Sequence, residues 1–138
     1  MKMRLLTIGV LAVAAYLVVQ HLFLEQSSSD VPGKPLVQVK VPTLSAPSQL
    51  GEQLFNENCA SCHGKNAAGQ YGVAPPLVHI IYEPNHHGDM AFQLAAKRGV
   101  RQHHWHFGSM PAVPSVTQQD VSKITAYVRE LQRANGIY

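Results

Sequence analysis

The sequence predicts an all-α head domain over residues 48–138, which follows an apolar N-terminal segment and a linker. Apolar residues between positions 50 and 55 recur at helical spacing. Thr117 and Asp120 form a capping pair at the start of a long amphipathic stretch. The only alternating stretch, Val37 to Val41, has no partner that could pair with it as a strand. These observations favour three or four helices and no sheet.

Residues 1–24 are predicted to form a single-pass membrane anchor. Lys2 and Arg4 precede an apolar run from Leu5 to Leu24, and about 20 helical residues at ~1.5 Å each span the roughly 30 Å of hydrocarbon in a bilayer. By the positive-inside rule, the N-terminus of this segment stays in the cytoplasm. The segment is then expected to cross a bacterial inner membrane once, with the head in the periplasm. The alternative is a signal peptide cleaved near Ser27–Ser29, which would release a soluble periplasmic protein.

Residues 25–47 are predicted to be a flexible, semi-extended linker. The stretch is rich in Ser, Val and Gln and holds four prolines, a composition typical of spacers. In polyproline geometry, at about 3.1 Å per residue, it could reach roughly 70 Å. Such a tether would let the head move between two neighbours at the membrane surface.

Three helices are expected within the head. The first leads into Cys59, and Gly51 in it is expected to allow close approach to the last helix near Tyr127. The second is expected from Met90 to Arg98, with Asp89 as its cap and Gly99 as its stop. The last runs from the Thr117 cap to about Arg133. Its apolar stripe consists of Val121, Ile124, Tyr127, Val128 and Leu131.

The run Cys59-Ala60-Ser61-Cys62-His63 has the spacing of a c-type haem attachment site. Two thiols one helical turn apart can each add to a vinyl group on one porphyrin edge, and the adjacent histidine can then bind the iron. The motif uses both cysteines of the chain. A zinc site would lack thiolate partners, and no βαβ pattern supports a thioredoxin-type motif. We therefore expect one covalent haem c, without which the head would be poorly folded.

The charge distribution excludes nucleic-acid binding. The formal net charge is +3 and the pI about 9.0. The head, however, holds seven Lys/Arg against six Asp/Glu, and two haem propionates would make it slightly acidic. No basic stripe remains to bind phosphates, and no catalytic triad or phosphate-binding loop is present.

Met110 is the expected sixth ligand of the iron. A thioether is a soft ligand suited to haem iron, and Met110 lies in an irregular Gly-Ser-Met-Pro segment able to lie over a haem face. Met90, the other methionine of the head, falls on an amphipathic helix, where methionine usually fills a core. The alternative is ligation by a histidine from the segment just before Met110.

Histidines are unusually frequent between the proline loop and Met110. Imidazole suits copper and zinc, and a second metal site, with copper as the first expectation, is one interpretation. Surface histidines that titrate near neutral pH are the other. The candidate ligands are His86, His87, His103, His104 and His106.

Two further features surround these histidines. Lys97, Arg98 and Arg101 would make this edge of the head positive, so docking of an acidic partner is expected to depend on salt and pH. Trp105, the only tryptophan, either donates its indole N–H to a haem propionate or packs in the core.

With these pieces in place, the head resembles a class I cytochrome c. The resemblance implies a small three-to-four-helix fold around one covalent haem, with His63 below the iron and Met110 above it. It also implies that a carbonyl of the proline loop accepts the His63 Nδ1–H, with Pro76 or its neighbour Pro75 in that role. The residues that carry the resemblance are Gly51, Phe55, Cys59 to Gly64, Pro75-Pro76-Leu77, Met110-Pro111, and Tyr127-Val128 before Leu131.

The expected function is that of a one-electron carrier and not an enzyme. The chain would shuttle electrons between redox proteins, a donor and an acceptor, at the membrane surface. One alternative is a haem protein with an exchangeable sixth ligand, such as a peroxidase, although peroxidases resembling this family usually carry two attachment motifs. The other is a copper-handling or sensing haem protein that uses the histidine-rich region.

Overall fold

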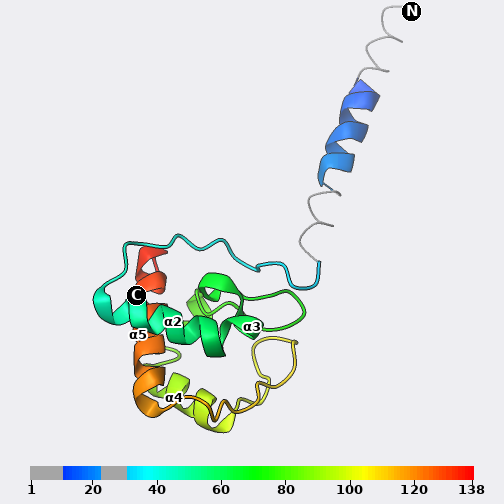
Figure 1. Cartoon of the computed structure of the whole chain (residues 1–138). Coiled ribbons are helices and arrows are strands. Elements are labelled where there is room, and N and C mark those ends of the chain that lie inside the picture. The colour runs from blue at the N-terminus through cyan, green and yellow to red at the C-terminus, as the bar shows by residue number, and fades with distance from the viewer. Residues whose placement is uncertain (1–10, 23–30) are drawn as a thin grey trace, which may run out of the picture. The chain divides into compact units, whose positions relative to one another are not determined.

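The protein divides into two compact units between Val31 and Pro32. The structure, a computed structural model, describes residues 11–22 and 31–138. Residues 11–22 are helical. The elements of the second unit (Figure 1) are α2 (Ala46–Asn58), α3 (Ala60–His63), η1 (Lys65–Ala67), η2 (Ile80–Tyr82), α4 (Asp89–Arg98) and α5 (Gln118–Ala134).

The prediction of an all-α domain is confirmed for the part of the chain that the structure describes. Its β pairing is limited to two isolated bridges, between Gln70 and Ala74 and between Val100 and Met110. The second of these bridges closes a loop over residues 101–109. His103, His104 and Trp105 of this loop line the main cavity of the second unit.

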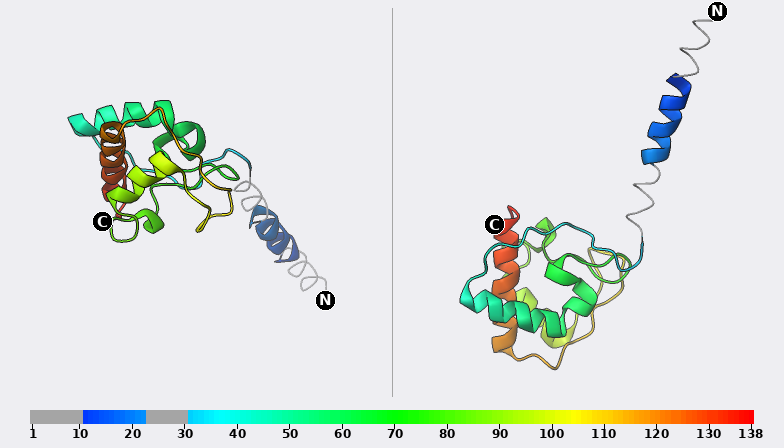
Figure 2. Two further views of the ribbon diagram at one scale, coloured as in Figure 1. Left: turned by 90° about the horizontal axis from the view of Figure 1, so that it is seen from below. Right: turned by 45° about the horizontal axis from the view of Figure 1, so that its top comes forward.

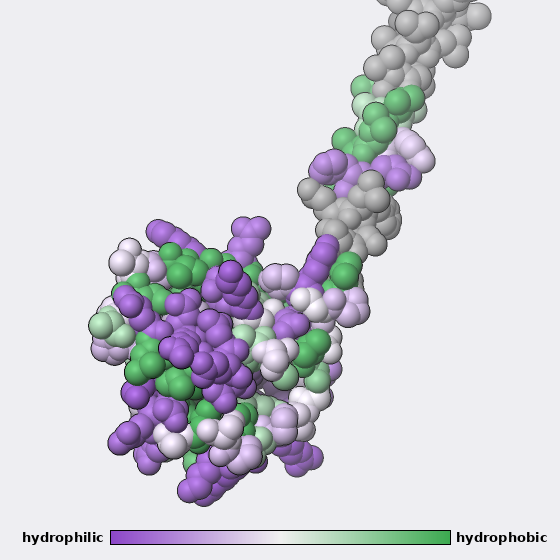
Figure 3. Space-filling model, viewed as in Figure 1, coloured by the Kyte–Doolittle hydropathy of each residue, from purple (hydrophilic) through white to green (hydrophobic). Residues whose placement is uncertain are grey.

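No helix within residues 11–22 and 31–138 has the length and hydropathy that a membrane crossing requires. The predicted anchor covers residues 1–24, of which 1–10 and 23–24 lie outside the described residues. The helix over residues 11–22 carries exposed apolar side chains, among them Leu11, Leu17 and Leu22 (Figure 3). The anchor therefore stays a prediction.

Helices α2 and α5 cross at one side of the second unit, as Figures 1 and 2 show from three directions. A Cβ atom at Gly51 would lie 2.7 Å from the carbonyl carbon of Lys123 and 3.0 Å from the Cβ of Tyr127. The expected role of Gly51 in the crossing is therefore confirmed. Below it, the rings of Phe55 and Tyr127 pack at 5.6 Å between centroids, and both side chains are fully buried.

Helix α5 begins where the capping pair predicts. The Thr117 hydroxyl accepts the Asp120 N–H at 3.2 Å, and the Asp120 carboxylate accepts the Thr117 N–H at 3.0 Å. This reciprocal cap satisfies two backbone donors that a helix start leaves unpaired. The predicted apolar stripe is confirmed as the core face of the helix: Val121, Ile124, Tyr127, Val128 and Leu131 are all buried.

Helix α4 begins one residue earlier than expected, and the expected cap at Asp89 is wrong. Gly88 is the cap residue, and no side chain caps the helix. The Asp89 carboxylate instead accepts the Nε–H of Arg129 at 2.9 Å, an ion pair with α5 that local sequence does not reveal. Gly99 ends the helix at a φ of 74°, as expected.

Residues 32–47 are part of the compact unit, which corrects the expected linker boundary at residue 47. The Leu36 N–H donates to the Ala68 carbonyl at 3.1 Å. Lys40 exchanges two bonds with the Asn135 side chain, its N–H donating at 2.9 Å and its carbonyl accepting at 2.8 Å. Backbone bonds of this kind leave no periodic pattern in the sequence, so composition alone suggested a free tether.

Candidate functional site

His63 ends the short helix α3, directly after the second cysteine. Its side chain is buried, and its Nδ1 lies 2.9 Å from the Pro75 carbonyl oxygen. Because a carbonyl only accepts, Nδ1 carries the proton and Nε2 keeps its lone pair. Burial lowers the pKa of His63, and the bond to Pro75 opposes this effect only in part. The imidazole is therefore held neutral with Nε2 ready to bind a metal.

Of the two prolines expected in this role, Pro75 and not Pro76 supplies the carbonyl to His63. The two carbonyls follow each other in a non-helical segment, where successive peptide groups point to different sides, so one of them at most can face the ring. Pro76 is instead fully buried.

Cys59 is the turn residue that joins α2 to α3, and Cys62 lies within α3. Both are free thiols, Cys59 half-buried and Cys62 exposed. Burial, with a smaller effect of Cys62, raises the pKa of the Cys59 thiol to about 11. The Gln70 side chain donates to the carbonyls of Ala60, at 3.2 Å, and Ser61, at 2.8 Å. This clamp was not predicted, since a glutamine in a Gly/Ala-rich loop carries no recognisable signal.

A cavity of about 500 Å³ opens beside these residues. Cys59, Cys62 and His63 line it, and most of the remaining lining is apolar. Leu94 of α4 is 42% exposed although it lines the cavity, and α4 buries none of its residues fully. Part of the cavity-facing side of α4 is thus left uncovered by the described residues. Other apolar lining residues are Phe55, Leu77, Val100 and Val113.

Met110 lines the same cavity as His63. Its backbone N–H and carbonyl pair with Val100, both at 2.9 Å. A Cβ at Gly99 would lie 2.5 Å from the Met110 carbonyl oxygen, so the glycine stop of α4 also lets this segment approach. Met90, by contrast, is 62% exposed and does not line the cavity. The expectation that Met90 fills a core is therefore wrong. Within residues 31–138, Met110 is the methionine that lines the cavity.

Trp105 lies in the 101–109 loop and lines the cavity. Its ring stacks on Phe107 at 5.7 Å and meets the His79 ring edge-on at 5.2 Å. The indole N–H is buried, and none of the described residues accepts a hydrogen bond from it. Burial raises the pKa of Tyr82 to about 12, and the neighbouring Trp105 side chain opposes this shift only in part. A buried donor without an acceptor indicates a missing polar partner.

These features fit a covalent haem. Two thiols, a neutral buried imidazole and a thioether line one cavity, and its apolar walls match the faces of a porphyrin. The unpaired Trp105 N–H is a donor that a propionate could satisfy.

Four of the five histidines that were candidates for a second metal converge at the rim of the cavity. His86 and His87 follow η2, and His103 and His104 belong to the 101–109 loop. We call these four the histidine cluster. Its neighbouring ring centroids lie 4.3 to 5.8 Å apart. Among the residues described, His106 makes no ring contact with the cluster.

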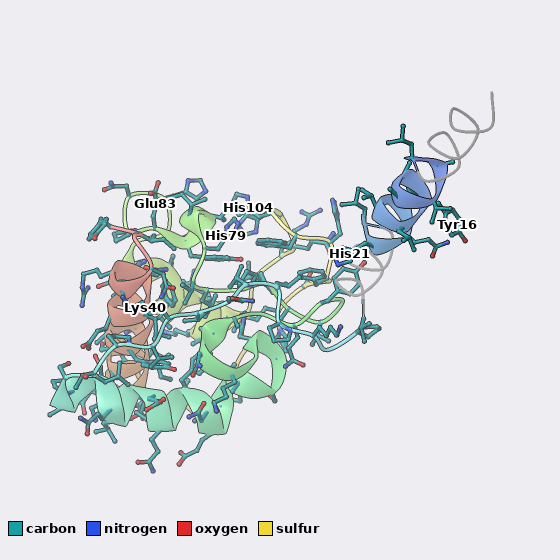
Figure 4. The ribbon with its side chains drawn as sticks, turned by 90° about the horizontal axis from the view of Figure 1, so that it is seen from above. Tyr16, His21, Lys40, His79, Glu83 and His104 are labelled. Carbon is teal, nitrogen blue, oxygen red and sulfur yellow. The ribbon has the colours of Figure 1, made fainter. Side chains whose placement is uncertain are left out.

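The cluster lies on the edge of the second unit where Figure 4 labels His79, Glu83 and His104. Burial lowers the pKa of His87 more than its bond to the Ile81 carbonyl raises it, and the nearby His86, His103 and Arg129 lower it further. Desolvation and the neighbouring rings likewise lower the pKa of His104. Both shifts favour the neutral form of the ring.

Arg129 and Gln132 of α5 hold the segment that carries His86 and His87. Arg129 is buried and donates to the carbonyls of Tyr82, at 2.6 Å, and His87. Gln132 donates to the carbonyls of Leu77, at 2.8 Å, and Tyr82, at 2.9 Å. Both side chains flank the apolar stripe of α5. Their role could not be predicted from the sequence, because it depends on partners more than 40 residues away in the chain.

Comparison with known proteins identifies haem proteins. The Cytochrome c family model matches residues 48–132. The chain is 30% identical over 106 residues to the Cbb3-type cytochrome c oxidase subunit CcoP of Rhodobacter capsulatus, which covers 74% of this chain and 33% of that protein. It is 46% identical over 44 residues to the CcoP subunit of Azospirillum brasilense, covering 28% and 15%.

The matched region thus spans about a third or less of these curated relatives. No solved structure matches the chain significantly, and nothing in these comparisons points to copper. The family match covers more than half of the sequence and includes both cysteines and His63. The chain belongs to the cytochrome c family, and its head is a class I c-type cytochrome that serves haem-based electron transfer.

Proposed function

We propose that this chain is a one-electron carrier in which His63 and Met110 are the two axial ligands of a haem c bound through Cys59 and Cys62. One observation carries the proposal: all four side chains line a single apolar cavity. When bound, the haem supplies the ferric/ferrous couple, and Met/His ligation favours a high potential. With both axial positions filled, no site remains for dioxygen or peroxide, so the chain itself is a carrier and not an enzyme.

The protein's own residues prepare this ligation. The Pro75 carbonyl fixes the tautomer of His63 and strengthens its Nε2 as a donor. The pairing of Met110 with Val100 holds the thioether segment against the end of α4. Trp105 offers its unpaired N–H to a propionate, and Arg98, which lines the cavity, offers a positive charge to the same group. The apolar walls of the cavity would exclude water from a bound haem.

We further propose that the electron acceptor or donor belongs to a membrane oxidase complex. Two of the relatives are named as CcoP subunits of cbb3-type oxidases, and the apolar run over residues 1–24 would anchor the head in the inner membrane, on its periplasmic side. Lys97, Arg98 and Arg101 are exposed and would steer an acidic partner. Electron transfer should then slow as ionic strength rises; a rate independent of salt would count against this docking.

The ligand assignment is tested with Met110→Ala, using Met90→Ala as the matched control. The ferric wild-type chain should show the near-infrared band of a thioether–iron bond, and its ferrous form should not bind carbon monoxide. The Met110→Ala variant should lose the band and bind carbon monoxide, whereas the Met90→Ala variant should behave as wild type because Met90 does not line the cavity. A Met110→Ala spectrum equal to that of wild type would exclude Met110 as the ligand.

A further inference from the structure

The histidine cluster brings together two segments that are 16 or more residues apart in sequence. The Nε2 atoms of His86 and His104 lie 3.2 Å apart. Each of His86, His87 and His104 has a ring nitrogen within 4.8 Å of one in each of the others. We propose that these three imidazoles form a binding site for one copper ion at the rim of the haem cavity. The site uses none of the residues that we propose to bind the haem iron, and in this it rests on the proposed ligation by Met110 rather than by a histidine of the same loop.

The spacing of the nitrogens suits a metal. Imidazole nitrogens bind such ions at about 2.0–2.1 Å, so two neighbouring ligands stand roughly 2.9 Å apart in the square-planar geometry that Cu(II) prefers and roughly 3.3 Å apart in a tetrahedral site. The nitrogens of His86 and His104, 3.2 Å apart, already lie within this range. His87 completes the group, because one of its ring nitrogens lies within 4.8 Å of a ring nitrogen of each of the other two.

The surroundings orient the rings for this purpose. The His87 Nδ1–H donates to the Ile81 carbonyl at 2.7 Å, which leaves Nε2 with a lone pair. The main-chain carbonyl of His87 accepts a bond from buried Arg129, so its backbone is fixed from α5. At protein metal sites, a histidine that binds the metal through one ring nitrogen commonly donates the N–H of its other ring nitrogen to a backbone carbonyl.

A fourth ligand is within reach. The His103 ring lies 4.3 Å from that of His104, and its Nδ1–H donates to the Arg101 carbonyl at 2.9 Å. Its Nε2 is therefore also left with a lone pair. His86 and His104 are exposed, so an ion can enter from solvent.

The donor set selects the metal. The group consists of imidazoles, with neither thiolate nor carboxylate among its three members. Imidazole suits copper, zinc and nickel, and among these divalent ions Cu(II) binds most tightly to a given nitrogen site. The alternative is that the cluster binds no metal and that the 3.2 Å contact between His86 and His104 is a simple hydrogen bond.

The test uses the full haem-loaded chain with ferric iron, purified without a histidine tag. Cu(II) is titrated by calorimetry, and its environment is read by electron paramagnetic resonance. The variants are His86→Asn with His104→Asn, both at exposed positions, and His106→Asn as the matched control from the same loop. Circular dichroism and the haem spectrum confirm that each variant is folded.

Wild type should bind one Cu(II) per chain with hyperfine splitting from at least three nitrogens. The double variant should bind it at least 100-fold more weakly, and the His106→Asn variant within threefold of wild type. Zinc should compete with copper only at large excess. The proposal is overturned if wild type binds no copper, or if the double variant binds it as tightly as wild type. Zinc binding tighter than copper would overturn the choice of metal.

Discussion

Replacing Gly51 by alanine should strongly destabilise the head. The new Cβ would lie 2.7 Å from the backbone carbonyl carbon of Lys123, whereas carbon atoms in contact prefer about 3.5–4.0 Å. Helices α2 and α5 would have to separate by about 1 Å, because the obstacle is main chain and no rotamer change relieves it. Overpacking of this kind costs about 1–3 kcal/mol, against a gain of up to ~1 kcal/mol in helix propensity.

Because the obstacle is main chain, the cost should fall in the upper part of that range, about 2–3 kcal/mol, which leaves a net loss of about 1–2 kcal/mol in the free energy of unfolding. Urea unfolding of the haem-loaded chain, followed by far-ultraviolet circular dichroism, measures it as a lower midpoint at unchanged slope. Asn56→Ala is the matched control: Asn56 is exposed on the same helix and should gain a few tenths of a kcal/mol, up to about 0.5. A Gly51→Ala chain as stable as this control would refute the close crossing.

Three further predictions concern α5. Thr117→Ala removes the capping hydroxyl and should lower the free energy of unfolding by about 1 kcal/mol, measured by the same denaturation; no change would mean that the cap adds nothing. Tyr127→Phe removes a buried hydroxyl that has no partner, so stability should stay equal or rise by up to about 1 kcal/mol; a clear loss of stability would imply a hidden partner. Hydrogen bonds from Ser48 and Ser45 lower the pKa of Glu130. The ionised carboxylate therefore stabilises the fold at pH values above its ordinary pKa, and this stabilisation is lost as pH falls through the lowered pKa. Glu130→Gln should therefore flatten the acid side of the stability profile, and an unchanged slope would contradict this.

Features determined by neighbouring residues could be predicted from the sequence. The attachment motif, the reciprocal cap of α5 and its apolar stripe depend on residues within one or a few helical turns. Gly51 could also be predicted, because a glycine inside a helix needs a reason, and a close crossing is the common one. All of these appear in the structure at the expected residues.

Features that depend on distant partners could not be predicted. Asp89 has the sequence signature of a cap, yet its carboxylate pairs with Arg129, 40 residues away. The choice between Pro75 and Pro76 depends on which carbonyl faces His63. Residues 32–47 dock through main-chain bonds that composition does not encode.

The histidine cluster belongs to the same class. Its two segments meet because α5 holds one of them through Arg129 and Gln132, while the bridge between Val100 and Met110 closes the other into a loop. The sequence showed that histidines were abundant there, but not which of them converge. Their number suggested five ligands, and the fold groups four of them.

The most direct test of the central claim is the optical spectrum of the full chain, matured in a bacterium that assembles c-type cytochromes. We predict a covalently attached haem c, with the near-infrared thioether–iron band in the ferric state and no change on adding carbon monoxide in the ferrous state. A colourless protein would contradict haem attachment at Cys59 and Cys62. A coloured protein that lacks the band and binds carbon monoxide would contradict ligation by Met110 and the carrier function that depends on it.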